Sequence, residues 1–238
     1  MSAFPGGTAM SRVRVYDWPT TDGAWGGSPH LHTASTEGYV VLAGHGSLET
    51  LSGAGYGEHT LAPGTVLWFT PGTVHRLVNT GGDLELLVVM NNAGLPEAGD
   101  AVLTFPQEVL DDPAAYAAAA ALPATEDEAV VAAAARKRRD LAVEGYLVLK
   151  DRVRTEGAAA LANLWRTAAV LVRERTAQWR DLWRDGPLAH TVTTGDYLDN
   201  LTEGDGSHLA ASQVYSAGRA SNRFGMCGHL TTWDLSHA

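Results

Sequence analysis

The pattern of hydrophobic residues in this chain changes abruptly near Pro106. Before this point, short runs of β-branched and aromatic residues alternate with glycine and proline, which is typical of strands joined by tight turns. After it, alanine, leucine, arginine and glutamate predominate, and apolar residues recur at helical spacing. The sequence therefore predicts a mainly β domain at residues 11–105 and a mostly helical extension at residues 106–238.

Six runs carry the strand signal: "RVRVYDW", "EGYVVLAG", "TVLWFTPG", "HRLVN", "LELLVVM" and "AVLTF". Runs at this spacing indicate an antiparallel sandwich or a small barrel. The turns "AGHGS" and "NTGGD" supply the glycines that tight hairpins require. With 238 residues, of which 45% are hydrophobic, the chain can bury a sizeable core.

In the second region we expect helices at about residues 107–121, 125–155 and 158–184, with "RDGPL" ending the third through Gly186 and Pro187. The third helix has an apolar stripe that should pack on the β domain as a lid or form a subunit interface. Its residues are Leu161, Leu164, Trp165, Ala168, Leu171, Val172, Trp179, Leu182 and Trp183.

Three further segments of this region carry weaker signals. A short helix could start near Thr193, and "MCGHLTTWDL" has the pattern of a terminal strand. The basic cluster Arg136–Arg139 is expected to be a solvated helix face, because four basic residues are a weak signal in an acidic chain.

Composition limits the partners of the chain. A formal net charge of −10 and a pI of about 5.3 argue against nucleic acid and against an anionic membrane surface, which both require a basic footprint. No window approaches the roughly 18 apolar residues of a spanning helix, and the first residues lack a signal-peptide core. The single cysteine, Cys227, excludes an intrachain disulfide. We expect a cytoplasmic protein with a small-molecule substrate, in homodimeric form.

Two segments contain residues with metal-binding chemistry. His30 and His32 are two residues apart in a predicted strand, so both imidazoles can face one cavity. Glu37 follows after a polar link, and His75 emerges from a turn made by Pro71 and Gly72. Imidazole and carboxylate groups together are common ligands of divalent transition metals.

These segments resemble the two motifs of the cupin family. In "HLHTASTEGYVVLAG" the matching residues are His30, His32, Glu37 and Gly44, and in "GTVLWFTPGTVHRLVN" they are Gly64, Pro71, Gly72, His75 and Asn79. The resemblance implies a double-stranded β-helix barrel that holds a divalent metal on His30, His32, Glu37 and His75. The helical region has no second histidine pair of this kind, so the chain resembles a single cupin with an appendage.

Three imidazoles and one carboxylate fill four positions of an octahedral ion and leave two for substrate, dioxygen or water. Such an open site favours catalysis over a structural role. Iron(II) or manganese(II) is favoured, and nickel, zinc and cobalt are also compatible with these ligands.

Other residues could complete the site. Tyr39 shares the strand face of Glu37, so it is a candidate acid–base residue, with barrel packing as the alternative. Trp68 and Phe69 alternate faces, so one of them should line the cavity. The other histidines lack ligand spacing, and His59 is expected in an exposed loop.

Together these features predict a metal-dependent cupin enzyme that acts on a small organic molecule. A dioxygenase-type oxidoreductase or an isomerase of a sugar or keto acid fits best, because an open metal site suits both reactions. Both stay open, because cupin barrels host many reactions and no residue in the sequence selects between these two. The alternative is a non-catalytic cupin that binds or senses a small molecule. The absence of a basic DNA-reading module in the sequence favours the enzyme.

Overall fold

The computed structural model describes residues 4–235, so the last three positions of the predicted extension lie outside it. Its strands are β1 (Ala9–Val15), β2 (His30–His32), β3 (Glu37–Ala43), β4 (Gly46–Ser52), β5 (Gly55–Leu61), β6 (Val66–Phe69), β7 (Val74–Asn79), β8 (Glu85–Met90), β9 (Ala101–Leu103), β10 (Ser221–Phe224) and β11 (Gly228–Thr232). Its helices are α1 (Gln107–Leu110), α2 (Pro113–Ala120), α3 (Glu128–Glu156), α4 (Ala162–Val172), α5 (Thr176–Trp183) and α6 (Ala189–Thr202). No helix within residues 4–235 is long and apolar enough to cross a bilayer.

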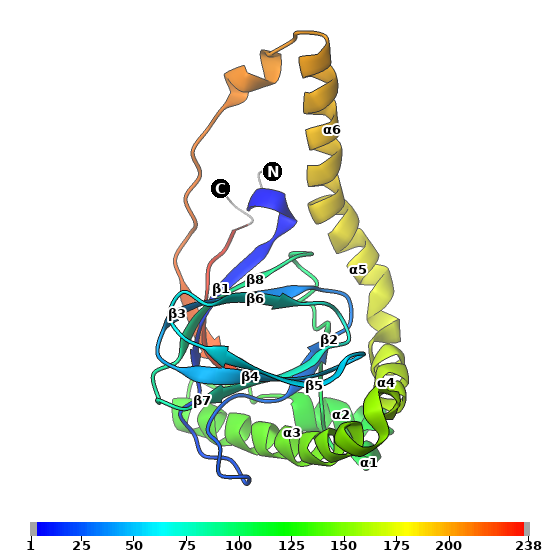
Figure 1. Ribbon diagram of the computed structural model, residues 1–238. Helices are drawn as coiled ribbons and strands as arrows, with labels where there is room; N and C mark the ends of the chain where they lie inside the picture. The colour runs from blue at the N-terminus through cyan, green and yellow to red at the C-terminus, as the bar shows by residue number, and fades with distance from the viewer. Residues whose placement is uncertain (1–3, 236–238) are drawn as a thin grey trace.

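The strands form two sheets that face each other as a barrel (Figure 1). The six-stranded sheet has the order β10-β11-β1-β8-β3-β6, and the five-stranded sheet has the order β5-β4-β7-β2-β9. Side chains alternate between the interior and the outside: in β3, Glu37, Tyr39 and Val41 are buried, whereas Leu42 is exposed. The predicted β-barrel followed by a helical region is confirmed.

Apolar side chains from both sheets fill much of the barrel interior. Full burial of one such side chain contributes about 1.5–3 kcal/mol relative to leaving it in water. This core fixes the strands that carry the polar residues described below. Its members include Val13, Val15, Tyr39, Val41, Leu48, Leu61, Leu77, Leu86 and Val88.

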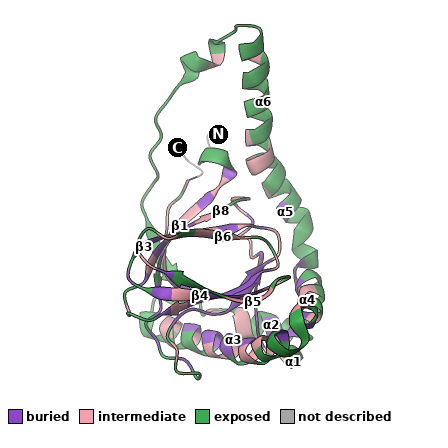
Figure 2. Cartoon of the chain, in the orientation of Figure 1, coloured by how far each residue is buried: buried purple, intermediate pink, exposed green. Residues whose placement is uncertain are grey.

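A second core lies between the outer face of the five-stranded sheet and the helices, which lie along that side of the barrel (Figure 2). Leu31 and Val74 of the sheet belong to the same buried cluster as Leu164 and Trp179 of the helices. The apolar stripe of the extension therefore packs on the barrel of its own chain. Trp183, at the end of the stripe, is 44% exposed.

A buried charged network also ties α3 to the five-stranded sheet. Glu49 of β4 accepts a hydrogen bond from Tyr146 at 3.1 Å and forms an ion pair with Lys150. Arg76 of β7 lies 3.6 Å from the same carboxylate and 2.7 Å from that of Asp22. Because buried charges are unfavourable unless they are paired, this network fixes the position of α3 on the sheet.

The end of the described chain returns to the barrel. β11 pairs antiparallel with β1, with Gly228 opposite Val15, and β10 pairs with β11. A Cβ at Gly228 would lie 2.0 Å from the carbonyl oxygen of Arg14, so only glycine permits this approach. The segment expected to form a terminal strand thus completes the six-stranded sheet.

The first two predicted helices differ from those observed in where they begin and break. Residues 107–121 form two short helices, because Pro113 has no N–H and Asp112 caps a new helix by accepting two backbone hydrogen bonds. The next helix begins at Glu128, where the side chain of Asp127 caps it in the same way.

The prediction that "RDGPL" ends the third helix is wrong. Arg184–Leu188 forms a π-helical turn, in which the N–H of Ala189 donates to the carbonyl of Arg184, five residues earlier. The wider turn accommodates Pro187, which has no N–H of its own. The helix therefore resumes as α6 at Ala189 instead of starting near Thr193.

The expectation that Arg136–Arg139 forms a solvated face is also wrong for two of its residues. Arg139 is 1% exposed and donates to the carbonyl of Trp18 at 2.7 Å. Arg138 is buried and donates to the carbonyl of Gly225 at 2.8 Å. Both guanidinium groups are buried because they satisfy backbone carbonyls of distant segments, which fastens α3 to those segments.

Gly145 lies where α3 approaches the backbone that follows β9. A Cβ at this position would lie 2.3 Å from the carbonyl oxygen of Thr104. We expect Gly145→Ala to lower the free energy of unfolding by about 1–3 kcal/mol, because the backbone must move, despite the higher helix propensity of alanine. Urea unfolding followed by circular dichroism measures this change.

Gly195→Ala in α6 is the matched control, because nothing lies within 4 Å of a Cβ there. This substitution should leave the stability unchanged or raise it by up to about 1 kcal/mol. Equal losses in the two variants would contradict the close-approach explanation.

Candidate metal centre

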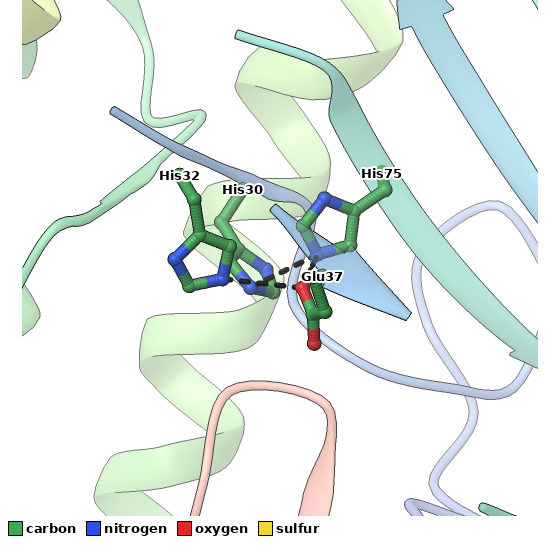
Figure 3. A group of neighbouring side chains, drawn as sticks. All are labelled: His30, His32, Glu37 and His75. Carbon is green, nitrogen blue, oxygen red and sulfur yellow. Dashed lines mark hydrogen bonds and ion pairs between the residues drawn. The ribbon is translucent and has the colours of Figure 1, made fainter. Parts of the chain in front are cut away.

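Four polar side chains meet in the barrel interior (Figure 3). His30 and His32 lie on β2, where alternate residues face the same side. Glu37 is the first residue of β3, and His75 lies opposite His30 in the β2–β7 pair. Each is at most 7% exposed. The structure thus brings together all four residues that the sequence motifs indicate.

The four side chains point toward one another (Figure 3). Each offers one ligand atom, and these atoms lie within 4.8 Å of one another. The Nε2 atoms of His30 and His75 are 3.1 Å apart, and Oε2 of Glu37 lies 3.2 Å from Nε2 of both His32 and His75. One ion could contact all four, because nitrogen and oxygen ligands lie about 2.0–2.2 Å from such an ion.

Backbone carbonyls hold the outward nitrogens of two rings. Nδ1 of His30 lies 2.8 Å from the carbonyl oxygen of Ser28, and Nδ1 of His75 lies 3.2 Å from that of Thr73. A carbonyl only accepts, so each Nδ1 carries the proton and each Nε2 of the neutral ring presents a lone pair. This is the tautomer that binds a metal through Nε2.

Asp100 holds the third ring. Its Oδ1 lies 2.6 Å from Nδ1 of His32, and its Oδ2 accepts the backbone N–H of Ser35 at 3.0 Å. Burial alone would raise the pKa of Asp100, but its hydrogen bond and charge interaction with His32 outweigh burial and lower it. An ionised Asp100 orients His32 and makes its Nε2 a stronger ligand.

The arrangement fits a bound cation. Two Nε2 lone pairs that face each other at 3.1 Å repel unless positive charge lies between them. Oε2 of Glu37 is buried beside these nitrogens but makes no hydrogen bond with any residue that the structure describes. A buried unsatisfied carboxylate oxygen is costly, and a divalent ion would satisfy it together with the lone pairs.

The pKa shifts favour the ligand forms of two of these residues. Burial lowers the pKa of His30 well below its ordinary value, and the charges of His75 and His32 lower it further. Burial would raise the pKa of Glu37, but the charges of the neighbouring His75 and His32 hold it well below its usual range. Neutral imidazole and ionised carboxylate are the forms that bind metals.

A cavity of about 720 Å³ lies beside the cluster, between the barrel and α4. Phe69 lines it, and the ring centroid of Phe69 lies 4.3 Å from that of His75. Thr50, which is opposite His75 in the β4–β7 pair, lines it as well. Trp68 also contributes, although its side chain is mostly exposed, so both members of the predicted Trp68–Phe69 pair line the cavity.

The cavity lining is rich in hydroxyl groups and poor in charged side chains. Apolar and hydroxyl side chains surround it, and none of the described residues that line it is Lys, Arg, Asp or Glu. His59 lines it too, on β5 rather than in the predicted loop, with Nε2 3.3 Å from Oγ1 of Thr50. The lining consists of Leu31, Thr33, Thr50, Ser52, Gly53, His59, Trp68, Phe69, Thr70, Pro71, Gly72, Thr73, Trp165, Ala168 and Ala169.

The helical extension forms one wall of this cavity. Trp165, Ala168 and Ala169 of α4 line it, and Nε1 of Trp165 donates to the carbonyl of Gly72 at 2.8 Å. Gly72 belongs to the turn that precedes His75, so α4 fixes this rim of the barrel. The extension thus contributes directly to the site.

Tyr39 lies inside the barrel, as the strand pattern predicts. Its side chain is 1% exposed, and its ring centroid lies 6.4 Å from that of His75. The buried hydroxyl makes no hydrogen bond with a described residue. Burial raises the pKa of Tyr39 well above its ordinary value, and the charge of Glu37 raises it further, so the hydroxyl keeps its proton near neutrality.

The sequence analysis does not identify three contributors to the site. Asp100 is 68 residues from His32 and lies in no motif with it. Trp165 has the spacing of a core residue, and His59 has no ligand spacing, so neither shows its place at the cavity. Only chain folding brings these residues to the barrel.

Comparisons with known proteins agree with this description. Residues 21–90, which include all four clustered residues, match the family model of the cupin domain. This part of the β-barrel is therefore similar to a cupin domain, as the sequence motifs suggest. No curated protein matches the chain.

Solved structures resemble part of the chain at low identity. An uncharacterized conserved protein with a double-stranded beta-helix domain from Klebsiella pneumoniae is 18% identical over 35% of this chain and 66% of its own, with a TM-score of 0.29. A TDP-fucose-3,4-ketoisomerase from Campylobacter jejuni is 17% identical over 38% and 64%, with a TM-score of 0.32. A predicted oxalate decarboxylase from Thermotoga maritima is 24% identical over 35% and 64%, with a TM-score of 0.27. Similarities of this size do not indicate a substrate.

The cluster predicts metal content. Purified protein should carry about one divalent ion per chain, and His30→Ala or His75→Ala should lower the affinity by about 10²-fold or more, because each removes one of four ligands. Elemental analysis after dialysis measures this. His59→Ala is the control, because His59 is outside the cluster and should not affect metal content. Equal content in all variants would contradict the four-ligand assignment.

The pKa of His32 predicts proton release on metal binding. Burial lowers this pKa, but the hydrogen bond to Asp100 and the negative charges of Asp100 and Glu37 outweigh burial and raise it to about 10. A protonated imidazole cannot bind a metal, so below this pKa each ion must displace a proton, and affinity should fall about tenfold per unit of falling pH. Calorimetric titration with Mn²⁺ near neutral pH, in two buffers of different ionisation enthalpy, counts the protons. Absence of proton release would contradict the prediction.

Proposed function

We propose that this chain is a metal-dependent enzyme that acts on a small organic molecule with little charge. The observation that carries the proposal is the position of the cluster of His30, His32, Glu37 and His75 beside a cavity of about 720 Å³. A cavity of this size suits a small molecule, and its lining, which is poor in charged side chains, disfavours a highly charged one. A cytoplasmic location fits the single cysteine, Cys227, which is a free thiol.

The favoured ion is iron(II) or manganese(II), and nickel, zinc or cobalt would also suit the ligands. When bound, such an ion would supply Lewis-acid polarisation of a substrate oxygen or activation of dioxygen. Held by these four residues, the ion would still be open to such partners. The reaction is therefore proposed to be of the dioxygenase type or an isomerisation of a sugar or keto acid.

The residues around the cluster have distinct roles in this proposal. Asp100 orients His32, and the carbonyls of Ser28 and Thr73 orient the other two rings. Phe69 covers His75 and would keep bulk water from the reacting atoms. The hydroxyl groups and His59 of the cavity would hold the part of the substrate that lies away from the ion.

Tyr39 is proposed to supply a proton to the bound substrate. A tyrosine with an ordinary pKa of about 10 acts as a base near neutrality only if a cation favours its phenolate. Burial and the charge of Glu37 raise the pKa of Tyr39, so proton donation is the better supported of its two roles. Its unpaired hydroxyl is free to donate to a ligand within the barrel.

A substrate screen tests the function. Protein purified without oxygen is loaded with Fe²⁺ or Mn²⁺ and mixed with panels of small phenols, sugars and keto acids, while an oxygen electrode and proton NMR record oxygen use and product. Oxygen consumption with product supports the dioxygenase reaction, and product without oxygen use supports the isomerase. Binding of a panel member without turnover would favour the non-catalytic cupin instead.

Tyr39→Phe tests the proposed acid on the substrate that this screen identifies. The change keeps the ring volume and removes only the hydroxyl, so fold and metal content should persist while turnover falls by about 10²-fold or more. Tyr56→Phe makes the same change on β5, where the hydroxyl contacts Glu49 and Glu58 outside the cluster, and should leave turnover unchanged. Unchanged turnover in Tyr39→Phe would assign Tyr39 to packing.

A further inference from the structure

Residues 184–220 form an arm that extends away from the barrel and then returns to it (Figure 1). The arm contains α6 and rises past the six-stranded sheet, on the side opposite to α3. All of its residues are described, and none of them is buried (Figure 2). Most helical stability in proteins comes from the packing of an apolar face, so contact with another surface would stabilise this arm.

One side of α6 is apolar and mostly exposed. Leu201 shares a helical face with Tyr197 and Leu198, because it lies four and three residues after them, and the three side chains are 52%, 43% and 60% exposed. The ring of Tyr197 also stacks on that of His208, with 4.4 Å between the centroids. Leu209, in the turn after α6, is 62% exposed. The acidic residues of the helix gather on its other side: Asp196, Asp199 and Glu203.

The outer face of the six-stranded sheet is apolar and uncovered as well. Strand register places Val66, Val40 and Leu87 in one row across β6, β3 and β8, and Trp68 and Val89 in the next row. Val66 is 62% exposed and Trp68 is 72% exposed. Contiguous exposed apolar patches of this kind mark interaction sites. β6 is also the last strand of its sheet, which leaves one strand edge open.

The charges of the two surfaces are complementary. Arg12 and Arg14 of β1 are exposed, and register places Arg12 beside Leu87 on the outer face of the sheet. Arg12 is already paired with Glu85 of β8 at 2.7 Å, so Arg14 is the cation that this strand offers to the arm. Residues 189–218 of the arm contain no Lys or Arg. Their acidic residues are Asp196, Asp199, Glu203 and Asp205.

We propose that these surfaces join two copies of the chain, with the arm of each copy lying across the six-stranded sheet of the other. The arm and the six-stranded sheet lie on the same side of the molecule, away from α3 (Figure 1), so a two-fold axis on that side would let each arm cover the sheet of its partner. A second copy is the occupant because this one chain supplies both apolar patches and both signs of charge. The pairing is independent of the metal centre, which lies inside the barrel.

Two substitutions in the full chain test the pairing. Analytical ultracentrifugation should give a dimer for the unmodified protein at about 10 μM. Val66→Asp or Leu198→Asp should raise the dimer dissociation constant by about 10²-fold or more, because each substitution buries an unpaired charge in the interface. Val148→Asp is the matched control: Val148 is a valine with the same 62% exposure as Val66, but it lies on α3. It should leave the dimer intact.

Circular dichroism and metal content check that each variant keeps its fold. The two test positions lie on separate elements, so if one variant does not fold, the other variant still tests the pairing. A monomeric unmodified protein at about 100 μM would overturn the proposal, because the apolar patches would then have another occupant. A dimer that survives both Val66→Asp and Leu198→Asp, or that Val148→Asp weakens equally, would overturn it too.

Discussion

Two facing imidazole lone pairs, those of His30 and His75, beside a buried carboxylate are unfavourable unless positive charge lies among them. The barrel fixes this arrangement, because an oxygen acceptor holds the outward Nδ1 of each of the three rings. The register of β2 with β7 places His30 opposite His75, and a change of one residue would turn one of these rings out of the barrel. The rest of the domain serves to fix this register.

The helical extension is part of that support. Thr104, just after β9, donates to the carbonyl of Ala142 in α3 at 2.9 Å, and β9 pairs with β2. On the other side, Trp165 of α4 holds the carbonyl of Gly72, whose own N–H donates to the carbonyl of His32 at 2.8 Å. Movements of α3 or α4 would therefore reach the four clustered residues and the cavity through short chains of hydrogen bonds.

The outer faces of the two sheets differ in how they are covered. Helices of the same chain cover the five-stranded sheet, where the buried network of Glu49, Arg76 and Lys150 fixes their position. The six-stranded sheet presents Val66 and Trp68 to solvent instead. The barrel is therefore covered by helices on one side and open on the other, and the arm lies on the open side (Figure 1).

The sequence by itself determined the barrel, the helical region and the four clustered residues, because strand periodicity and motif spacing are local properties of the chain. It also placed Tyr39 inside the barrel, because side chains in a strand alternate. The local sequence did not predict the burial of Arg138 and Arg139. Both are buried because carbonyls of segments remote in the sequence accept their hydrogen bonds. Pro187 likewise does not end its helix, because a π-helical turn accommodates a residue without an N–H.

Only the tertiary structure decided which residues surround the cluster. Asp100 reaches His32 across 68 residues, and α4 brings Trp165 to the cavity, because the extension folds back on the five-stranded sheet of its own chain. The same folding buries the apolar stripe around Leu164 and leaves that of α6 exposed. Periodicity shows that a helix has an apolar side, but what covers that side depends on long-range packing, which no local pattern encodes.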